Sequence, residues 1–151
     1  MSKRAPRVND IPAWLLHAAP WRETSQLLQV FTRDHGVVAL VAKGSKRPYS
    51  ALRAVLHAFQ PLHISWTGGG EVRNLIRAEL AGVLPLGGKA LMSAWYLNEL
   101  VLRLLPREDP HPALFDAYGE ALRQLAQPPA PAAALRRFEW VLLQEAGYGV
   151  D

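Results

Sequence analysis

The sequence predicts an α+β protein in which a five-stranded OB-fold β-barrel is followed by an all-α helical domain. Three observations predict it. Short apolar runs separated by turn residues fill the first half of the chain. After Gly87-Gly88 the apolar residues recur at the three- and four-residue spacing of helices. The basic residues are concentrated in the first half. We expect the OB-fold domain to span residues 1–80 and the helical domain residues 81–151.

Five strands are expected in the first half. They are the stretches 11–19, 25–32, 37–42, 59–66 and 71–78. A short helix, 50–56, falls between the third and fourth strands, and residues up to about Val8 are expected to be disordered. Antiparallel strands with a helical insert at this place are typical of an OB-fold. An SH3-like barrel is the alternative, which the position of the helix disfavours.

Three helices are expected in the second half. Their ranges are 89–105, about 112–126 and 132–146. Residues 109–112 are candidates to cap the second helix, and the proline at 106 ends the first. The first helix is apolar on most of its circumference, which predicts that it is largely buried. In the third helix, we expect residues 141–143 to form an exposed apolar face.

The charge is unevenly divided between the halves. Residues 1–80 hold eleven basic and five acidic residues, a balance of 11 − 5 = +6, so the remainder carries −2 of the total of +4. A basic half suits a module that binds a polyanion, although basic residues also simply solvate surfaces. The chain has no cysteine, which excludes disulfides, thiolate metal sites and cysteine nucleophiles. With no apolar run long enough for a membrane span and no secretory signal, a cytoplasmic location is expected.

An OB-fold binds single-stranded nucleic acid by combining cations, which contact the phosphates, with aromatic rings, on which bases stack. The candidate phosphate contacts are Arg22, Arg33, Lys43, Lys46, Arg47, Arg73 and Arg77. The candidate stacking platforms are Trp21, Tyr49 and Trp66. Tyr49 is favoured because it adjoins the basic loop 43–47, whose glycine predicts a mobile contact, whereas Trp66 is expected to fill the core.

Catalysis finds little support in the sequence. The five histidines form no HxH or HExxH arrangement, and no nucleophile motif is present. We therefore expect no enzymatic activity, no cofactor and no metal. A hydrolase using Glu108, Asp109 and His111 is the remaining enzymatic alternative.

Several short motifs occur in a characteristic order, and in that order the chain resembles the bacterial recombination protein O (RecO) family. The motifs are Arg22-Glu23-Thr24-Ser25, Phe31-Thr32-Arg33-Asp34-His35-Gly36, Ala42-Lys43-Gly44, Phe59-Gln60-Pro61, Tyr96-Leu97-Asn98-Glu99-Leu100, Arg103-Leu104-Leu105-Pro106 and Arg137-Phe138-Glu139. Family members normally continue past Gly147-Tyr148, some with a cysteine-rich zinc segment, so the helical domain is expected to be truncated.

The resemblance implies a non-enzymatic mediator of DNA recombination and repair in the bacterial cytoplasm, at the nucleoid. Such a protein binds single- and double-stranded DNA, anneals complementary strands and helps to load RecA onto strands coated by single-strand binding protein. It also implies that the OB-fold contacts RecR and that the acidic, apolar C-terminal tail of single-strand binding protein docks on the helical domain. Arg103, Arg107, Arg136 and Arg137 are the candidate residues for that docking. The alternative is an adaptor that binds RecR and contacts DNA only incidentally.

Overall fold

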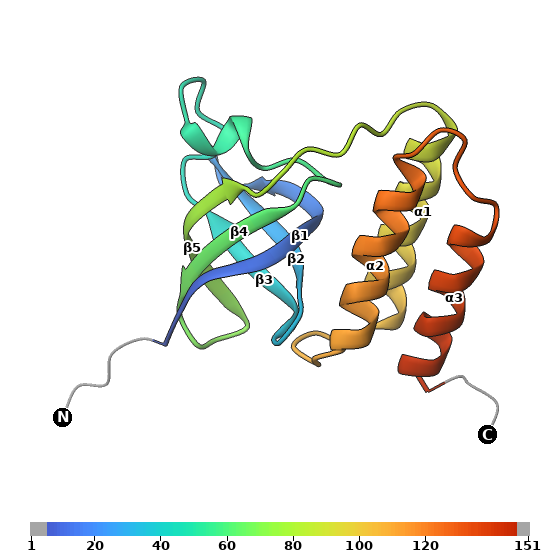
Figure 1. The fold of residues 1–151 in the computed structure, drawn as a ribbon. Helices are drawn as coiled ribbons and strands as arrows, with labels where there is room; N and C mark the ends of the chain where they lie inside the picture. The colour runs from blue at the N-terminus through green and yellow to red at the C-terminus, as the bar shows by residue number, and fades with distance from the viewer. Residues whose placement is uncertain (1–5, 148–151) are drawn as a thin grey trace. The chain divides into compact units, whose positions relative to one another are not determined.

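The strands of the first half close into a barrel, shown in blue to green in Figure 1. They are β1 (Arg7–Trp21), β2 (Ser25–Thr32), β3 (Gly36–Ala42), β4 (Leu62–Thr67) and β5 (Val72–Leu80). Their order around the barrel is β1-β2-β3-β5-β4. β1 pairs antiparallel with both β2 and β4, β4 pairs antiparallel with β5, and a short parallel pairing of β3 with β5 closes the sheet. The predicted OB-fold is confirmed.

Alternate residues of the strands fill the interior of the barrel. Leu28 and Val30 of β2 belong to this interior together with alternate residues of β3, and Trp66 of β4 is 1% exposed among them. This alternation is the expected consequence of the two-residue period of a strand. The complete interior cluster consists of Ala13, Leu15, Leu28, Val30, Val38, Leu40, Ala42, Leu62, Ile64 and Trp66.

The structure, a computed structural model that describes residues 6–147, corrects three predictions for the barrel. The first strand begins at Arg7, which pairs with Thr67, so disorder up to Val8 was wrong for the described part of that segment. The fourth strand begins at Leu62 and not at Phe59, because Phe59 has a φ of +68° and leaves the extended conformation. The predicted helix 50–56 is only a single turn of 3-10 helix, η1 (Ala51–Ala54), capped by Ser50.

The second half forms three helices, α1 (Lys89–Leu104), α2 (Pro112–Leu125) and α3 (Ala133–Glu145), drawn in yellow to red in Figure 1. The chain divides into two compact units, and these helices belong to the second, which contains Arg33–Val37 and the residues from Leu84 on. The first unit contains the residues up to Thr32 and Val38–Val83. Among the helices described, none has the length and apolar character needed to cross a membrane.

Helix α1 is less buried than its composition predicts. Only Ala94, Leu97, Asn98 and Val101 are buried, whereas Met92 is 74% exposed. One stripe of the helix is enough to pack against α2 and α3, so the rest of its apolar surface stays uncovered within this unit.

One further prediction for the helices needs correction, and the predicted cap of α2 falls within its range. Leu142 is 1% exposed and packs in the helical core, so only Leu143 of the predicted apolar face is strongly exposed. His111 occupies the N-cap position of α2 without a side-chain cap, and Pro112 begins the helix.

A buried hydrogen bond joins α1 to α2. The Tyr118 hydroxyl donates to Asn98 Oδ1, and both residues are at most 1% exposed. Burial raises the pKa of Tyr118 far above its ordinary value, so the phenol remains protonated and remains a donor. The ring also packs edge-to-face on Phe138 of α3, with 6.1 Å between the centroids. Tyr118 thus connects all three helices.

We predict that Tyr118→Phe lowers the free energy of unfolding by about 1–3 kcal/mol, because Asn98 loses a donor where water has no access. Urea denaturation measures this change. The matched control is Tyr96→Phe. The Tyr96 hydroxyl donates to Glu139 Oε2 at 3.3 Å, but Tyr96 is 41% exposed, so water can replace the lost hydrogen bond. The control should stay within about 0.5 kcal/mol of the unsubstituted chain. Equal losses in the two variants would contradict the assignment of the stabilisation to burial.

Candidate nucleic-acid interface

A groove of about 510 Å³ lies in the first unit, where the ends of several strands meet. Its residues come from the end of β1, the β1–β2 turn and the start of β2, from the end of β3 and the basic loop that follows it, and from the start of β5. They are Trp21, Arg22, Thr24, Ser25, Val41, Lys43, Gly44, Arg47 and Asn74. The groove therefore brings together three of the predicted phosphate contacts and one of the predicted aromatic platforms.

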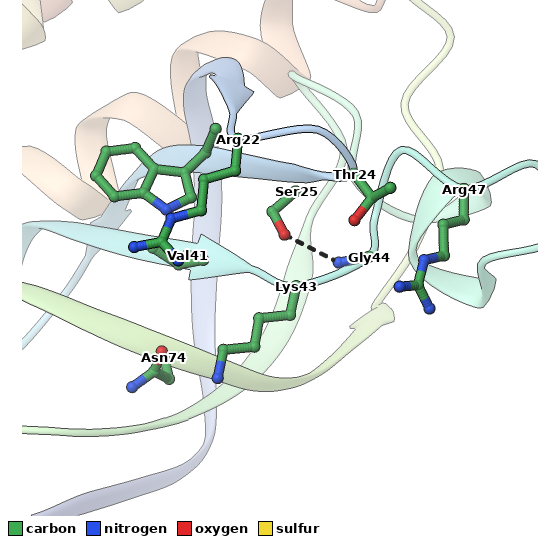
Figure 2. Close-up of a pocket in the computed structure, with 9 residues that line it drawn as sticks. Arg22, Thr24, Ser25, Val41, Lys43, Gly44, Arg47 and Asn74 are labelled. Carbon is green, nitrogen blue, oxygen red and sulfur yellow. Dashed lines mark hydrogen bonds between the residues drawn. The ribbon is translucent and has the colours of Figure 1, made fainter.

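The basic loop, residues 43–47, is tied to the β1–β2 turn and the start of β2. The Gly44 N–H donates to Ser25 Oγ at 3.2 Å, the contact drawn as a dashed line in Figure 2. The Lys46 N–H donates to the Thr24 carbonyl oxygen at 2.9 Å. Ser45 is fully buried and its hydroxyl donates to Gln26 Oε1 at 2.9 Å. These hydrogen bonds hold in place a loop that its glycine predicted to be mobile.

Two left-handed backbone conformations set the shape of the groove. Gly44 has a φ of +70°, which allows the loop to turn immediately after Lys43. Arg22 has a φ of +57°, a conformation that is uncommon for a residue with a side chain and that costs on the order of 1 kcal/mol. Such conformations cluster at functional sites, where the backbone positions a side chain at some cost in stability.

The cations of the groove are not neutralised by neighbouring carboxylates. No acidic residue lines the groove, and within residues 6–147 no ion pair engages Arg22, Lys43 or Arg47. All three are exposed. In Figure 2, Lys43 extends toward the strand that carries Asn74, whereas Arg47 descends from the loop. The site thus presents three unpaired positive charges, one from the β1–β2 turn and two from the basic loop.

Other predicted phosphate contacts are engaged elsewhere. Arg33 belongs to the second unit, where its Nε lies 3.2 Å from Asp116 Oδ1. That hydrogen bond, together with the negative charge of Asp116, raises the pKa of Arg33. Arg77 pairs with Glu79 on the same strand. The guanidinium of Arg73 lies 5.7 Å from the centroid of the Trp66 ring.

The remaining candidates differ in exposure. Lys46 lies on the basic loop and Tyr49 follows it, but neither lines the groove, and Tyr49 is fully exposed. Trp66 is 1% exposed in the barrel interior, so it has no free face for a base. Burial therefore removes Trp66 from the candidate platforms, as its place on a strand predicted.

The sequence did not single out Thr24, Ser25, Val41 or Asn74 as site residues. Thr24 and Ser25 belong to a motif that carried the family resemblance, and this was the available indication that they matter. Asn74 lies in the groove because it is in register with Val41 in the parallel pairing of β3 with β5. This register depends on closure of the barrel, so no local sequence pattern predicts it.

A second, smaller groove of about 220 Å³ lies between α2 and α3. Its walls are mainly apolar, with Phe138 and Val141 on one side and Ala121 on the other, and Arg137 and Glu120 contribute charges. Of the four arginines predicted to bind a partner, Arg137 alone lines this groove. Arg136 is exposed without lining it, Arg103 pairs with Glu99 at 2.7 Å, and Arg107 bridges to Val37 through its backbone.

Two residues of the hydrolase alternative, Asp109 and His111, lie in contact with each other. His111 Nε2 lies 3.0 Å from Asp109 Oδ2, and its Nδ1 lies 3.8 Å from Glu145 Oε2. No serine, threonine or cysteine is among these contacts. In the part of the chain that the structure describes, no cluster of three or more His, Cys, Asp or Glu residues is arranged to hold a metal ion.

Comparison with known proteins identifies both halves of the chain. The family model described as "Recombination protein O N terminal" matches residues 9–83, and the one described as "Recombination protein O C terminal" matches residues 87–151. Together they cover nearly the whole sequence and divide it between β5 and α1.

Curated relatives agree with these matches. "DNA repair protein RecO" of Azoarcus sp. (strain BH72) is 57% identical over 146 residues, which cover 96% of this chain and 60% of the relative. The protein of the same name from Aromatoleum aromaticum is 59% identical over 145 residues, covering 95% and 60%. That of Ralstonia nicotianae is 58% identical over 146 residues, covering 96% and 54%. The chain thus spans 54–60% of the length of these three relatives and belongs to the recombination protein O family.

Proposed function

We propose that this chain acts in DNA repair as a non-enzymatic recombination mediator that binds DNA through the groove of its barrel. The observation that carries the proposal is the cluster formed by Arg22, Lys43 and Arg47, which has no carboxylate to neutralise it. Unpaired cations bind the phosphate backbone by displacing its condensed counterions. Family membership supports the wider role, in which the protein anneals complementary strands and helps RecA to load in the bacterial cytoplasm, at the nucleoid.

The groove between α2 and α3 supports a second part of the proposal. An acidic, apolar peptide needs a narrow apolar channel for its side chains and a cation for its carboxylates. Phe138, Val141 and Ala121 supply the channel, and Arg137 supplies the cation. We assign this groove to the C-terminal tail of single-strand binding protein. Glu120, on the α2 side of the groove, would repel the carboxylates of the tail. The tail carboxylates would therefore have to lie on the α3 side, beside Arg137.

The alternative role of the first unit is to bind RecR through the barrel. The chain would then be an adaptor with only incidental affinity for DNA. In the first role the groove cations bind DNA, and in the second they are not needed for it. Measuring DNA binding by two variants that lose the same number of charges distinguishes the two roles.

The first test is the triple substitution Arg22→Ala, Lys43→Ala, Arg47→Ala. We predict that the slope of log Kd against log salt concentration for a single-stranded oligonucleotide decreases by about three, since each lost phosphate contact contributes about one unit. Fluorescence anisotropy across a salt series measures the slope. The melting temperature should change little, because all three side chains are exposed.

The matched control is Arg33→Ala, Arg77→Ala, Arg103→Ala, which removes the same three charges from residues that already pair with carboxylates. Its salt slope should stay close to that of the unsubstituted chain. If both triple variants lose affinity equally, general positive charge and not the groove binds DNA. Unchanged DNA binding in the groove variant, with RecR binding retained, would favour the adaptor.

The second test concerns the helical groove. We predict that Arg137→Ala weakens binding of a synthetic peptide copying the tail of single-strand binding protein by about two- to fivefold, the range expected for one exposed ion pair. Arg136→Ala, at the neighbouring exposed position, should leave the affinity unchanged. Isothermal titration calorimetry measures both. Equal effects of the two substitutions would remove the tail from this groove.

A further inference from the structure

We infer that the groove of the barrel holds an unpaired nucleotide, with its base stacked on Trp21 and its phosphate on the surrounding cations. This inference rests on the proposed DNA-binding function and adds to it the residue that contacts the face of an unpaired base. It assigns Trp21 as the residue that distinguishes a single strand from a duplex.

The first argument is the position of Trp21 relative to the cations. Trp21 is the last residue of β1 and lines the groove together with Arg22, Lys43 and Arg47. It is paired across the hairpin with Ser25, the residue that also receives the Gly44 N–H. Ser25 thereby links the backbone of Trp21 to the loop that carries Lys43 and Arg47. Single-strand binding sites combine these two elements.

The second argument is the exposure of the ring. Trp21 is half-buried, so its position is held by the protein while part of it stays accessible to a ligand. Tyr49, the platform that the sequence favoured, is fully exposed and does not line the groove. A free side chain loses conformational freedom when a base stacks on it, and a half-buried ring has already lost much of that freedom. Preorganisation therefore favours Trp21.

The third argument is that the composition of the lining fits one nucleotide. The volume of about 510 Å³ is in the range of small-ligand sites. Val41 is 8% exposed and adds an apolar side chain to the lining, and Thr24 and Asn74 add polar groups. In a duplex, both faces of each base are covered by neighbouring base pairs, so an indole gains a stacking surface only from an unpaired base.

The experiment compares Trp21→Leu, Trp21→Phe and Tyr49→Leu on three labelled ligands of equal length. The ligands are a single-stranded oligonucleotide, an abasic strand that keeps the same sugar-phosphate backbone but lacks the bases, and the corresponding duplex. We expect Trp21→Leu to weaken binding of the normal single strand at least about fivefold, as loss of one stacked base does. Trp21→Phe should recover most of the affinity. Binding of the abasic strand and of the duplex should stay unchanged.

Trp95→Leu, which removes a 49% exposed tryptophan of α1, is the control for loss of an indole and should have no effect. Equal affinity of the unsubstituted chain and Trp21→Leu for the normal strand would overturn the inference. So would an equal loss on all three ligands, which indicates a structural role, or a loss confined to Tyr49→Leu. In each of these cases the groove triple variant still reports separately whether DNA binds in the groove.

Discussion

The parallel pairing of β3 with β5 is the contact on which the candidate site depends. It extends over only three residue pairs, Ala39 with Val72, Leu40 with Arg73 and Val41 with Asn74. Without it the sheet would be open, with unpaired edges along both strands. With it, the last residues of β3 and the first of β5 lie side by side at the floor of the groove. Three stretches that are distant in sequence, residues 21–25, residues 41–47 and Asn74, then contribute to one site.

The amount of charge in the first half is a poor guide to where DNA would bind. The excess of basic residues there is large, but several arginines are engaged by carboxylates, and Arg73 lies against the face of a buried tryptophan. An engaged cation contributes less to a polyanion because it must first leave its partner. The local condition that matters is the absence of carboxylates around Arg22, Lys43 and Arg47 within the groove. A tethered loop maintains this condition, since its hydrogen bonds fix where Lys43 and Arg47 begin.

Much of the barrel was predictable because strand period and turn residues are local properties. The alternation of Leu28 with Val30 and the glycine at 36 indicate strands and a turn without knowledge of the rest of the chain. The basic loop and Trp21 were likewise visible as candidates. The burial of Ser45, the inclusion of Asn74 and the pairing of Arg33 with Asp116 were not visible, because each depends on segments far apart in the sequence. The apolar surface left exposed on α1 was missed for a similar reason, since composition alone does not show how many neighbours a helix has.

Stacking of a base on the half-buried ring of Trp21, as inferred above, would have a consequence for the release of a bound strand. A strand bound through stacking on a base stays bound only while no neighbouring base pair covers the face of that base. When a complementary strand pairs with it, the new base pair and its stacked neighbours occupy the surface that the indole used. Formation of the duplex would then compete directly with the protein for the same base, and the bound strand would leave without nucleotide hydrolysis or a conformational switch. Turnover would be driven by the stability of the duplex itself.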